Sequence, residues 1–103
     1  MSCTYVFEPR AAEEYEHAFL WYEERSIVAA ENFIIAVQDA ITQICTNPTR
    51  YRNSYKDFRE ITLRKYPYNL IYYFDLPKEL VIIVSVYHHK RNPKTKYKTK
   101  QSE

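Results

Sequence analysis

The stretch that decides the fold is Lys65–Pro93, KYPYNLIYYFDLPKELVIIVSVYHHKRNP. Residues 68–75 and 80–89 are rich in β-branched and aromatic side chains, which favour strands. The second run is aliphatic on both faces, as expected of a central strand. Residues 76–79, LPKE, supply the turn between the two runs. The stretch therefore predicts a β-hairpin whose last strand ends abruptly in two histidines and a basic run.

The residues upstream extend this hairpin into a meander. In residues 59–65, Ile61 and Leu63 share one face and polar side chains share the other, which predicts a further strand. Residues 49–57, TRYRNSYKD, are polar and basic and predict a connection before that strand.

The N-terminal half predicts one strand and two helices. Residues 3–8 have strand composition, and Pro9 suits the first position of a helix. Residues 10–25 and 26–46 have helical apolar spacing, with Ser26 as N-cap of the second helix. A join this short predicts an antiparallel helical hairpin.

The predicted architecture is a single α+β domain over residues 1–103, with a basic C-terminal tail from about residue 94. Its order is an N-terminal strand, an antiparallel helical hairpin, and a three-stranded antiparallel meander. The N-terminal strand is too short to be stable alone, so we expect it to join the meander in an antiparallel sheet of about four strands.

Composition excludes several classes of function. The chain has no glycine, which rules out a glycine-rich phosphate loop or a dinucleotide fingerprint. It also means that turns with positive φ are expected to use Asn or Asp. Charge is uneven: residues 1–45 hold eight acidic and two basic side chains, and residues 46–103 hold five acidic and thirteen basic ones. We interpret the N-terminal acids as solvating helix faces, and the basic half as a surface that meets a partner.

The cysteines and apolar runs predict a cytoplasmic protein without a membrane partner. Cys3 and Cys45 lack the spacing of a metal site and are expected to be reduced. The longest aliphatic run, Leu80–Val84, is too short to span a membrane. His17, His88 and His89 have no accompanying ligand cluster, so neither a metal site nor a cofactor is predicted.

The end of the last predicted strand carries the candidate site. His88 and His89 point to opposite faces of the sheet, and imidazole suits acid–base chemistry near neutral pH. The catalytic candidates are His88, His89, Arg91 and Arg64. Arg64, Lys90 and Arg91 are predicted to bind the target, helped by Lys94 and Lys96 in the tail. Proton transfer, phosphate binding and contact with an acidic partner all remain open from these residues alone.

The order of elements and two local motifs resemble the RelE/ParE superfamily of bacterial toxins. Many ParE-like members carry a pattern close to FPY-x-IYY followed by H-x-x-RNP. Its counterparts in this chain are Tyr66-Pro67-Tyr68 with Ile71-Tyr72-Tyr73, and the run HHKRNP at residues 88–93. The resemblance covers about residues 3–95.

The resemblance implies a cytoplasmic, growth-inhibiting toxin of a type II toxin–antitoxin module. Such modules are associated with plasmid stabilisation, and a cognate antitoxin neutralises the toxin. RelE-like members cut mRNA on the ribosome, whereas ParE-like members are associated with poisoning DNA gyrase. Trp21 lies off the main apolar stripe of its helix and is predicted to bind the antitoxin.

Three positions argue against nuclease chemistry. RelE-like toxins use lysines and an arginine on the meander, but here Glu60 and Thr62 stand where lysines are expected, and Asn69 where an arginine is expected. These residues remove positive charge from the place where a RelE-like toxin would stabilise the phosphate. We therefore predict a ParE-like toxin that acts by binding its target, with DNA gyrase as the candidate. The first alternative is a metal-free, ribosome-dependent mRNA endoribonuclease built on His88 or His89 with Arg91, completed by Arg64 and Tyr97. The second is a degenerate, non-toxic member that only binds an antitoxin-like peptide.

Overall fold

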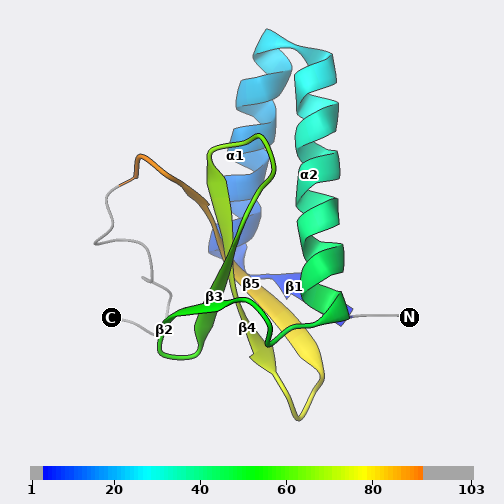
Figure 1. The fold of residues 1–103 in the computed structure, drawn as a ribbon. Helices are drawn as coiled ribbons and strands as arrows, with labels where there is room; N and C mark the ends of the chain where they lie inside the picture. Colours follow the sequence, from blue (N-terminus) through cyan, green and yellow to red (C-terminus); the bar gives the residue numbers. More distant parts are fainter. Residues whose placement is uncertain (1–3, 92–103) are drawn as a thin grey trace.

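A computed structural model describes residues 4–91 (Figure 1). It confirms the α+β class and the predicted order of strand, helical hairpin and meander. The elements are β1 (Thr4–Phe7), α1 (Pro9–Arg25), α2 (Ile27–Thr46), β2 (Arg52–Tyr55), β3 (Phe58–Thr62), β4 (Tyr68–Asp75) and β5 (Leu80–His88). The predicted basic tail, with Lys94, Lys96 and Tyr97, lies outside the described residues, as does Cys3.

The strands form one sheet in the order β1-β5-β4-β3-β2. As expected, β1 joins the meander. It runs parallel to β5, with Phe7 opposite Ile83, so the sheet is mixed and the prediction of an antiparallel sheet is wrong for this pair. The sheet has five strands instead of about four, because residues 52–55 of the predicted connection form the edge strand β2. Its backbone pairs with β3 while its side chains stay largely exposed, so no apolar alternation marks it in the sequence.

The helical hairpin forms as the sequence predicts. Pro9 occupies the start of α1, and the Ser26 Oγ accepts a hydrogen bond from the Ala29 N–H at 3.1 Å, which caps α2. Ser26 alone separates the two helices, so they fold back on each other and cover one face of the sheet (Figure 1). The core between them holds buried residues of both helices and of β3, β4 and β5, with Phe33, Val37, Ile44, Leu70 and Ile83 fully or almost fully buried.

A bulge in β5 changes which residues face the helices. The register shifts between Ile71 and Tyr72, so Ile83 and Val86 both belong to the core under the helices, while Val84 faces the other side. Tyr72 is fully buried, and its hydroxyl donates to the Pro48 carbonyl at 2.6 Å. Burial raises the pKa of Tyr72 to about 12.

Because the chain has no glycine, we expected Asn or Asp at positive φ in the tight turns. This expectation is wrong for the described residues. In the described part of the chain, positive φ angles occur at Lys56, Lys65 and Glu79, with values of 50°, 68° and 50°. A left-handed conformation costs such residues roughly 1–2 kcal/mol each. Strand pairing on both sides of each turn holds them there. Lys65 lies in the turn beside the basic end of β5.

Two further features of α2 bear on the sequence predictions. By length and composition alone α2 could cross a membrane, a test that the core helix of a globular domain also passes. The expectation of a reduced thiol is wrong for Cys45, which is disulfide-bonded. Sequence spacing does not reveal such pairing.

Candidate functional site

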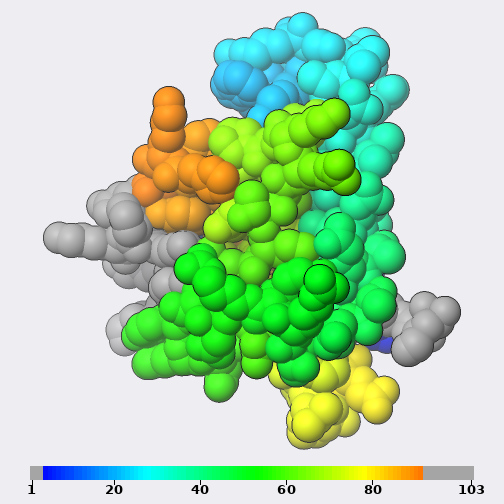
Figure 2. Space-filling view, in the orientation of Figure 1, coloured from blue at the N-terminus to red at the C-terminus, as the bar shows by residue number. Residues whose placement is uncertain are grey.

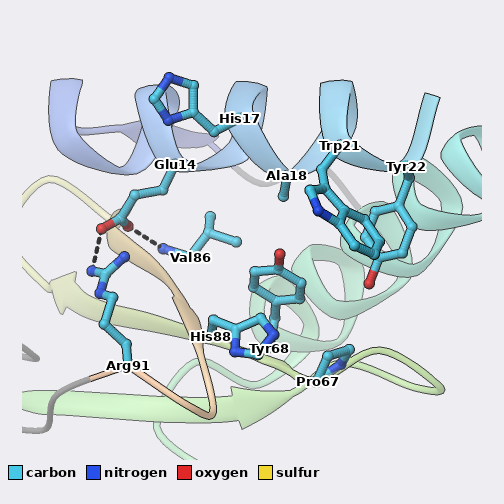
Figure 3. Close-up of a pocket in the computed structure, with 10 residues that line it drawn as sticks. All are labelled: Glu14, His17, Ala18, Trp21, Tyr22, Pro67, Tyr68, Val86, His88 and Arg91. Carbon is cyan, nitrogen blue, oxygen red and sulfur yellow. Dashed lines mark hydrogen bonds and ion pairs between the residues drawn. The ribbon is translucent and has the colours of Figure 1, made fainter. Parts of the chain in front are cut away.

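A pocket of about 460 Å³ opens where the end of β5 faces α1 (Figure 3). It exists because β1 stops at Phe7, opposite Ile83, so the edge of β5 beyond that point has no neighbouring strand. Helix α1 lies over the gap. Its lining residues from α1 are Glu14, His17, Ala18, Trp21 and Tyr22, and from the sheet and its end Pro67, Tyr68, Val86, His88 and Arg91.

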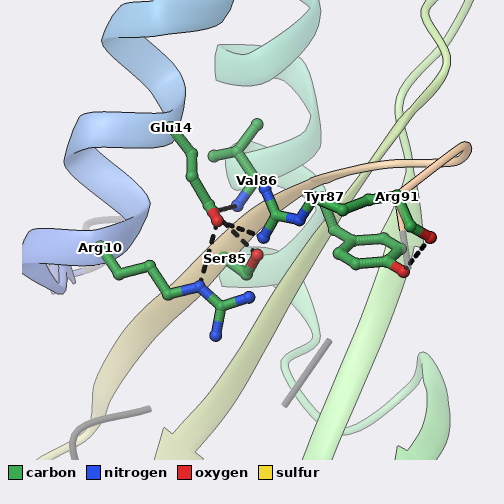
Figure 4. A network of polar contacts seen from close by, with 6 residues as sticks. All are labelled: Arg10, Glu14, Ser85, Val86, Tyr87 and Arg91. Atoms are coloured by element: carbon green, nitrogen blue, oxygen red, sulfur yellow. Dashed lines mark hydrogen bonds and ion pairs between the residues drawn. The ribbon is translucent and has the colours of Figure 1, made fainter. Parts of the chain in front are cut away.

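The Glu14 carboxylate closes one end of this pocket by completing the open edge of β5 (Figure 4). Its Oε1 accepts from the Val86 N–H and from the Ser85 hydroxyl, each at 2.8 Å. Its Oε2 pairs with Arg10, at 3.1 Å from Nε, and with the Arg91 guanidinium. Four donors on three segments therefore meet on a side chain that is only 14% exposed.

Glu14 is the pocket residue that sequence reasoning missed, because we counted it among the solvating acids. A signal was present. Glu14 lies three residues after Ala11 and four before Ala18, both buried, so it borders the apolar stripe of α1. The exposed Glu13 and Glu16 do not share that position.

Arg91 is anchored by Glu14. Besides the ion pair, its guanidinium carbon lies 5.0 Å from the centre of the Tyr87 ring, and the Tyr87 hydroxyl donates to the Arg91 carbonyl at 2.7 Å. The side chain keeps 32% of its surface exposed. Arg91 thus fixes the path of the chain after β5 and still reaches the pocket.

His88 faces the pocket as a neutral hydrogen-bond donor. The Lys90 N–H donates to its Nδ1 at 3.0 Å, which places the proton of the neutral ring on Nε2. The ring packs edge-on against Tyr68, with centroids 4.9 Å apart. Burial, and then the positive charges of His89, Lys90 and Arg91, lower the pKa of His88. A ring in this state is a poor proton acceptor at Nε2.

His89 lies on the opposite face of the sheet, as strand alternation predicted. Its Nε2 is 3.0 Å from the Asn69 Oδ1, and the Asn69 amide donates to the Glu60 Oε1 at 2.8 Å. Asn69 and Thr62 are cross-strand partners. The three residues that differ from the RelE pattern therefore lie together on the face away from the helices, with Glu60 only 4% exposed.

Two of the predicted target-binding residues, Arg64 and Lys90, lie in an exposed group with Lys65, and we call these three residues the basic rim. Arg64 and Lys65 lie in the β3–β4 turn, and Lys90 lies in the turn after β5. The His89 N–H donates to the Pro67 carbonyl at 2.9 Å and ties the two turns together. Figure 2 shows the segments of both turns next to each other, in orange and yellow-green. Within residues 4–91, none of the three side chains has an ion pair.

Trp21 lies at the other end of the pocket from Arg91 (Figure 3). Its side chain is half exposed, the Arg25 guanidinium carbon lies 3.7 Å from its ring centre, and Tyr22 packs against its edge. The pocket thus brings together Trp21, His88 and Arg91 of the predicted residues, while His89 and the basic rim lie outside it. Residues 4–91 contain no group of three or more side chains suited to hold a metal ion.

A family model described as "ParE toxin of type II toxin-antitoxin system, parDE" matches residues 5–93. A search of curated protein sequences found no match.

Solved structures with a similar fold come from toxin–antitoxin systems. The chromosomal ParDE system of P. aeruginosa includes a chain with a TM-score of 0.59 and 17% identity, covering 84% of this chain and 95% of that one. The intact E. coli RelBE toxin–antitoxin complex includes a chain with a TM-score of 0.60 and 21% identity, and the match covers 87% of this chain and 100% of that one. A mutant of E. coli RelE in complex with a peptide of the antitoxin RelB has a TM-score of 0.59 and 20% identity, and the match covers 93% of this chain and 92% of that one.

Proposed function

The chain belongs to the ParE family of toxins from type II toxin–antitoxin systems, and we propose that it acts by binding its target and not by cutting RNA. DNA gyrase is the target that we propose, and the cytoplasm the compartment. A cognate antitoxin is expected to neutralise the toxin, and the module to support plasmid stabilisation. Structurally similar chains occur in complexes with antitoxins, which supports such a partner.

The observation that carries the binding mechanism is the Glu60–Asn69 pair. Metal-free RNA cleavage requires cations that stabilise a pentacovalent phosphate. At two of the positions where the resemblance leads us to expect cations, a buried carboxylate and an amide hydrogen-bond to each other instead. His88, one of the two candidate proton-transfer groups, is held neutral with its Nδ1 occupied. These features favour a surface that binds over one that cleaves.

The basic rim is the proposed target-binding surface, with Arg91 as a supporting residue. Arg64, Lys65 and Lys90 project from two turns fixed by the sheet, so their positions are defined although their side chains are unpaired within residues 4–91. Arg91 belongs to the same end of the molecule but already neutralises Glu14. An acidic target surface would therefore meet the rim first.

Reversing charge on the basic rim should relieve growth inhibition. We expect the double variant Arg64→Glu, Lys90→Glu to inhibit growth at least about tenfold less than the wild type, since two unfavourable charge contacts each cost on the order of 1 kcal/mol. The readout is survival after induced expression at matched protein level. Lys78→Glu, an exposed lysine in the β4–β5 turn at the other end of the sheet, is the control and should remain fully toxic. Undiminished toxicity of the double variant would place the target-binding surface elsewhere.

The pocket is the proposed antitoxin site. It combines aromatic walls, Trp21, Tyr22 and Tyr68, with the open edge of β5. The Tyr68 N–H donates to the Tyr66 carbonyl, and the Tyr68 carbonyl accepts from the Leu63 N–H. Tyr68 therefore forms no backbone hydrogen bond with His88, its partner on β5, and the His88 N–H points away from β4 toward the pocket. Apolar side chains of an antitoxin peptide would fill the pocket while its backbone bonds to this edge.

A ribosome-dependent endoribonuclease is the second candidate. The observation that favours it is the exposed His89, which lies next to the basic rim with its Nε2 3.0 Å from the Asn69 Oδ1. The degenerate, non-toxic alternative is tested by the same growth assay, because it predicts that the wild type does not inhibit growth.

A further inference from the structure

The turn between β3 and β4 carries two members of the basic rim. Arg64 and Lys65 are exposed, and Lys65 has a positive φ of 68°. Two hydrogen bonds close the turn, from the Leu63 N–H to the Tyr68 carbonyl at 2.9 Å and from the Tyr68 N–H to the Tyr66 carbonyl at 2.8 Å. These bonds join the turn to its own strands, but they do not fix its direction relative to the helical hairpin.

Tyr66 ties this turn to the helical hairpin (Figure 1). Its hydroxyl donates to the Ala29 carbonyl at 3.0 Å, across 37 positions of the chain. Its ring packs edge-on against Tyr22 of α1 and Phe33 of α2, with ring centres 5.1 and 5.4 Å apart. Ala29 lies in the first turn of α2, and its own N–H donates to the Ser26 cap. The hydroxyl of Tyr66 therefore reaches a fixed point of the hairpin.

The place of Tyr66 in the chain lets one hydrogen bond hold both turns of the basic rim. Lys65 precedes Tyr66, and Pro67 follows it. The Pro67 carbonyl accepts from the His89 N–H at 2.9 Å, and Lys90 comes directly after His89. A left-handed residue such as Lys65 keeps its conformation only where its surroundings hold it. The bond from Tyr66 to α2 adds such a hold next to the residue that needs it.

We propose that Tyr66 is the positioning residue of the basic rim, through the bond from its hydroxyl to the Ala29 carbonyl. The inference rests on the proposed target-binding role of the rim. Arg64 and Lys65 lose less freedom on binding when their turn is already fixed, so the same charges bind an acidic target more tightly. Without the hydroxyl the charges remain, but the turn that carries them moves.

The variant Tyr66→Phe isolates this role, because it removes the hydroxyl and keeps the ring. The packing against Tyr22 and Phe33 is retained, so the variant should fold, and the pocket that Tyr22 lines should keep its shape. Tyr15→Phe is the matched control. Tyr15 is a half-buried tyrosine of α1 that stacks on Phe7, and within residues 4–91 its hydroxyl has no hydrogen-bond partner.

Nitrogen-15 NMR relaxation tests whether Tyr66 fixes the turn. In the wild type, the order parameters of the Arg64 and Lys65 backbone N–H groups should be about 0.85, the range of rigid backbone. In Tyr66→Phe they should fall below about 0.6, the range of flexible backbone, while those in the centre of β4 stay unchanged. Tyr15→Phe should match the wild type at all of these positions. Order parameters in Tyr66→Phe that equal those of the wild type would overturn the positioning role.

A double-mutant cycle tests whether Tyr66 acts through the charges of the basic rim. The readout is inhibition of gyrase supercoiling, at a temperature where every variant is folded. Tyr66→Phe should raise the concentration for half inhibition about fivefold, the size of one lost hydrogen bond. The pair Arg64→Gln, Lys65→Gln should raise it as well. Adding Tyr66→Phe to that pair should change nothing further, because the turn then carries no charge to position. The Kd for a cognate antitoxin should stay within about twofold throughout.

An equal effect of Tyr66→Phe with and without the two charges would overturn the inference, since a hydroxyl that only stabilises the fold acts alike in both backgrounds. Inhibition of gyrase by the wild type, together with an unchanged turn in Tyr66→Phe, refutes the inference and leaves the proposed function intact. A wild type that does not inhibit gyrase, with the turn mobile in Tyr66→Phe, refutes the proposed target and supports the role of Tyr66 in fixing the turn.

Discussion

Replacement of Glu14 by alanine should lower the free energy of unfolding by about 3 kcal/mol, because it leaves partly buried charges and a strand edge without their acceptor. Arg10, Arg91, Ser85 and the Val86 N–H all lose a partner at once. For a chain of this size, that loss corresponds to a fall in Tm of roughly 15 °C. Thermal or urea unfolding followed by circular dichroism measures it.

Glu13→Ala is the matched control, since Glu13 is the exposed neighbour on the same helix. It should change stability by no more than about 0.5 kcal/mol. Arg91→Ala should cost only about 1 kcal/mol, because Glu14 keeps its other three donors. Equal stability of the Glu13 and Glu14 variants would mean that Glu14 does not hold α1 to the edge of β5.

Replacement of Trp21 by alanine should weaken antitoxin binding by about 2 kcal/mol, or roughly 30-fold in Kd, the usual size for an aromatic anchor. The indole forms one end of the pocket, and its exposed surface is available for a partner to cover. Isothermal titration with a cognate antitoxin measures the change.

Leu20→Ala is the control for Trp21. Leu20 is a similarly exposed apolar residue on the same helix, but it does not line the pocket, and its replacement should leave the Kd within about twofold. If Trp21→Ala bound as tightly as the wild type, or if both variants lost affinity equally, the pocket would not be the site at which the antitoxin anchors.

Sequence reasoning predicted the elements that have strong periodicity. Both helices and the strands β3, β4 and β5 show apolar spacing because one or both of their faces are buried. β2 was not predicted, because an exposed edge strand is held by backbone hydrogen bonds and its side chains show no apolar alternation. The bulge in β5, opposite residues 71–72, was also hidden, since a one-residue shift in register has no compositional signature.

The candidate site was predicted in location and less well in organisation. The end of β5 was identified because a buried strand that turns abruptly basic is visible in the residues themselves. The partners of these residues were not visible. Glu14 is separated from Arg91 by most of the chain, and only the packing of α1 on β5 brings them together. Glu60 and Asn69 were interpreted as positions without the expected cations. The structure shows in addition that they hydrogen-bond to each other and that Asn69 contacts His89.

The claim that this toxin binds its target and does not cleave RNA is tested most directly by the integrity of mRNA on programmed ribosomes. After incubation with the purified protein, primer extension should show full-length mRNA. The same preparation should inhibit supercoiling by DNA gyrase. Site-specific cuts that disappear in His88→Ala or His89→Ala would contradict the claim and establish the endoribonuclease.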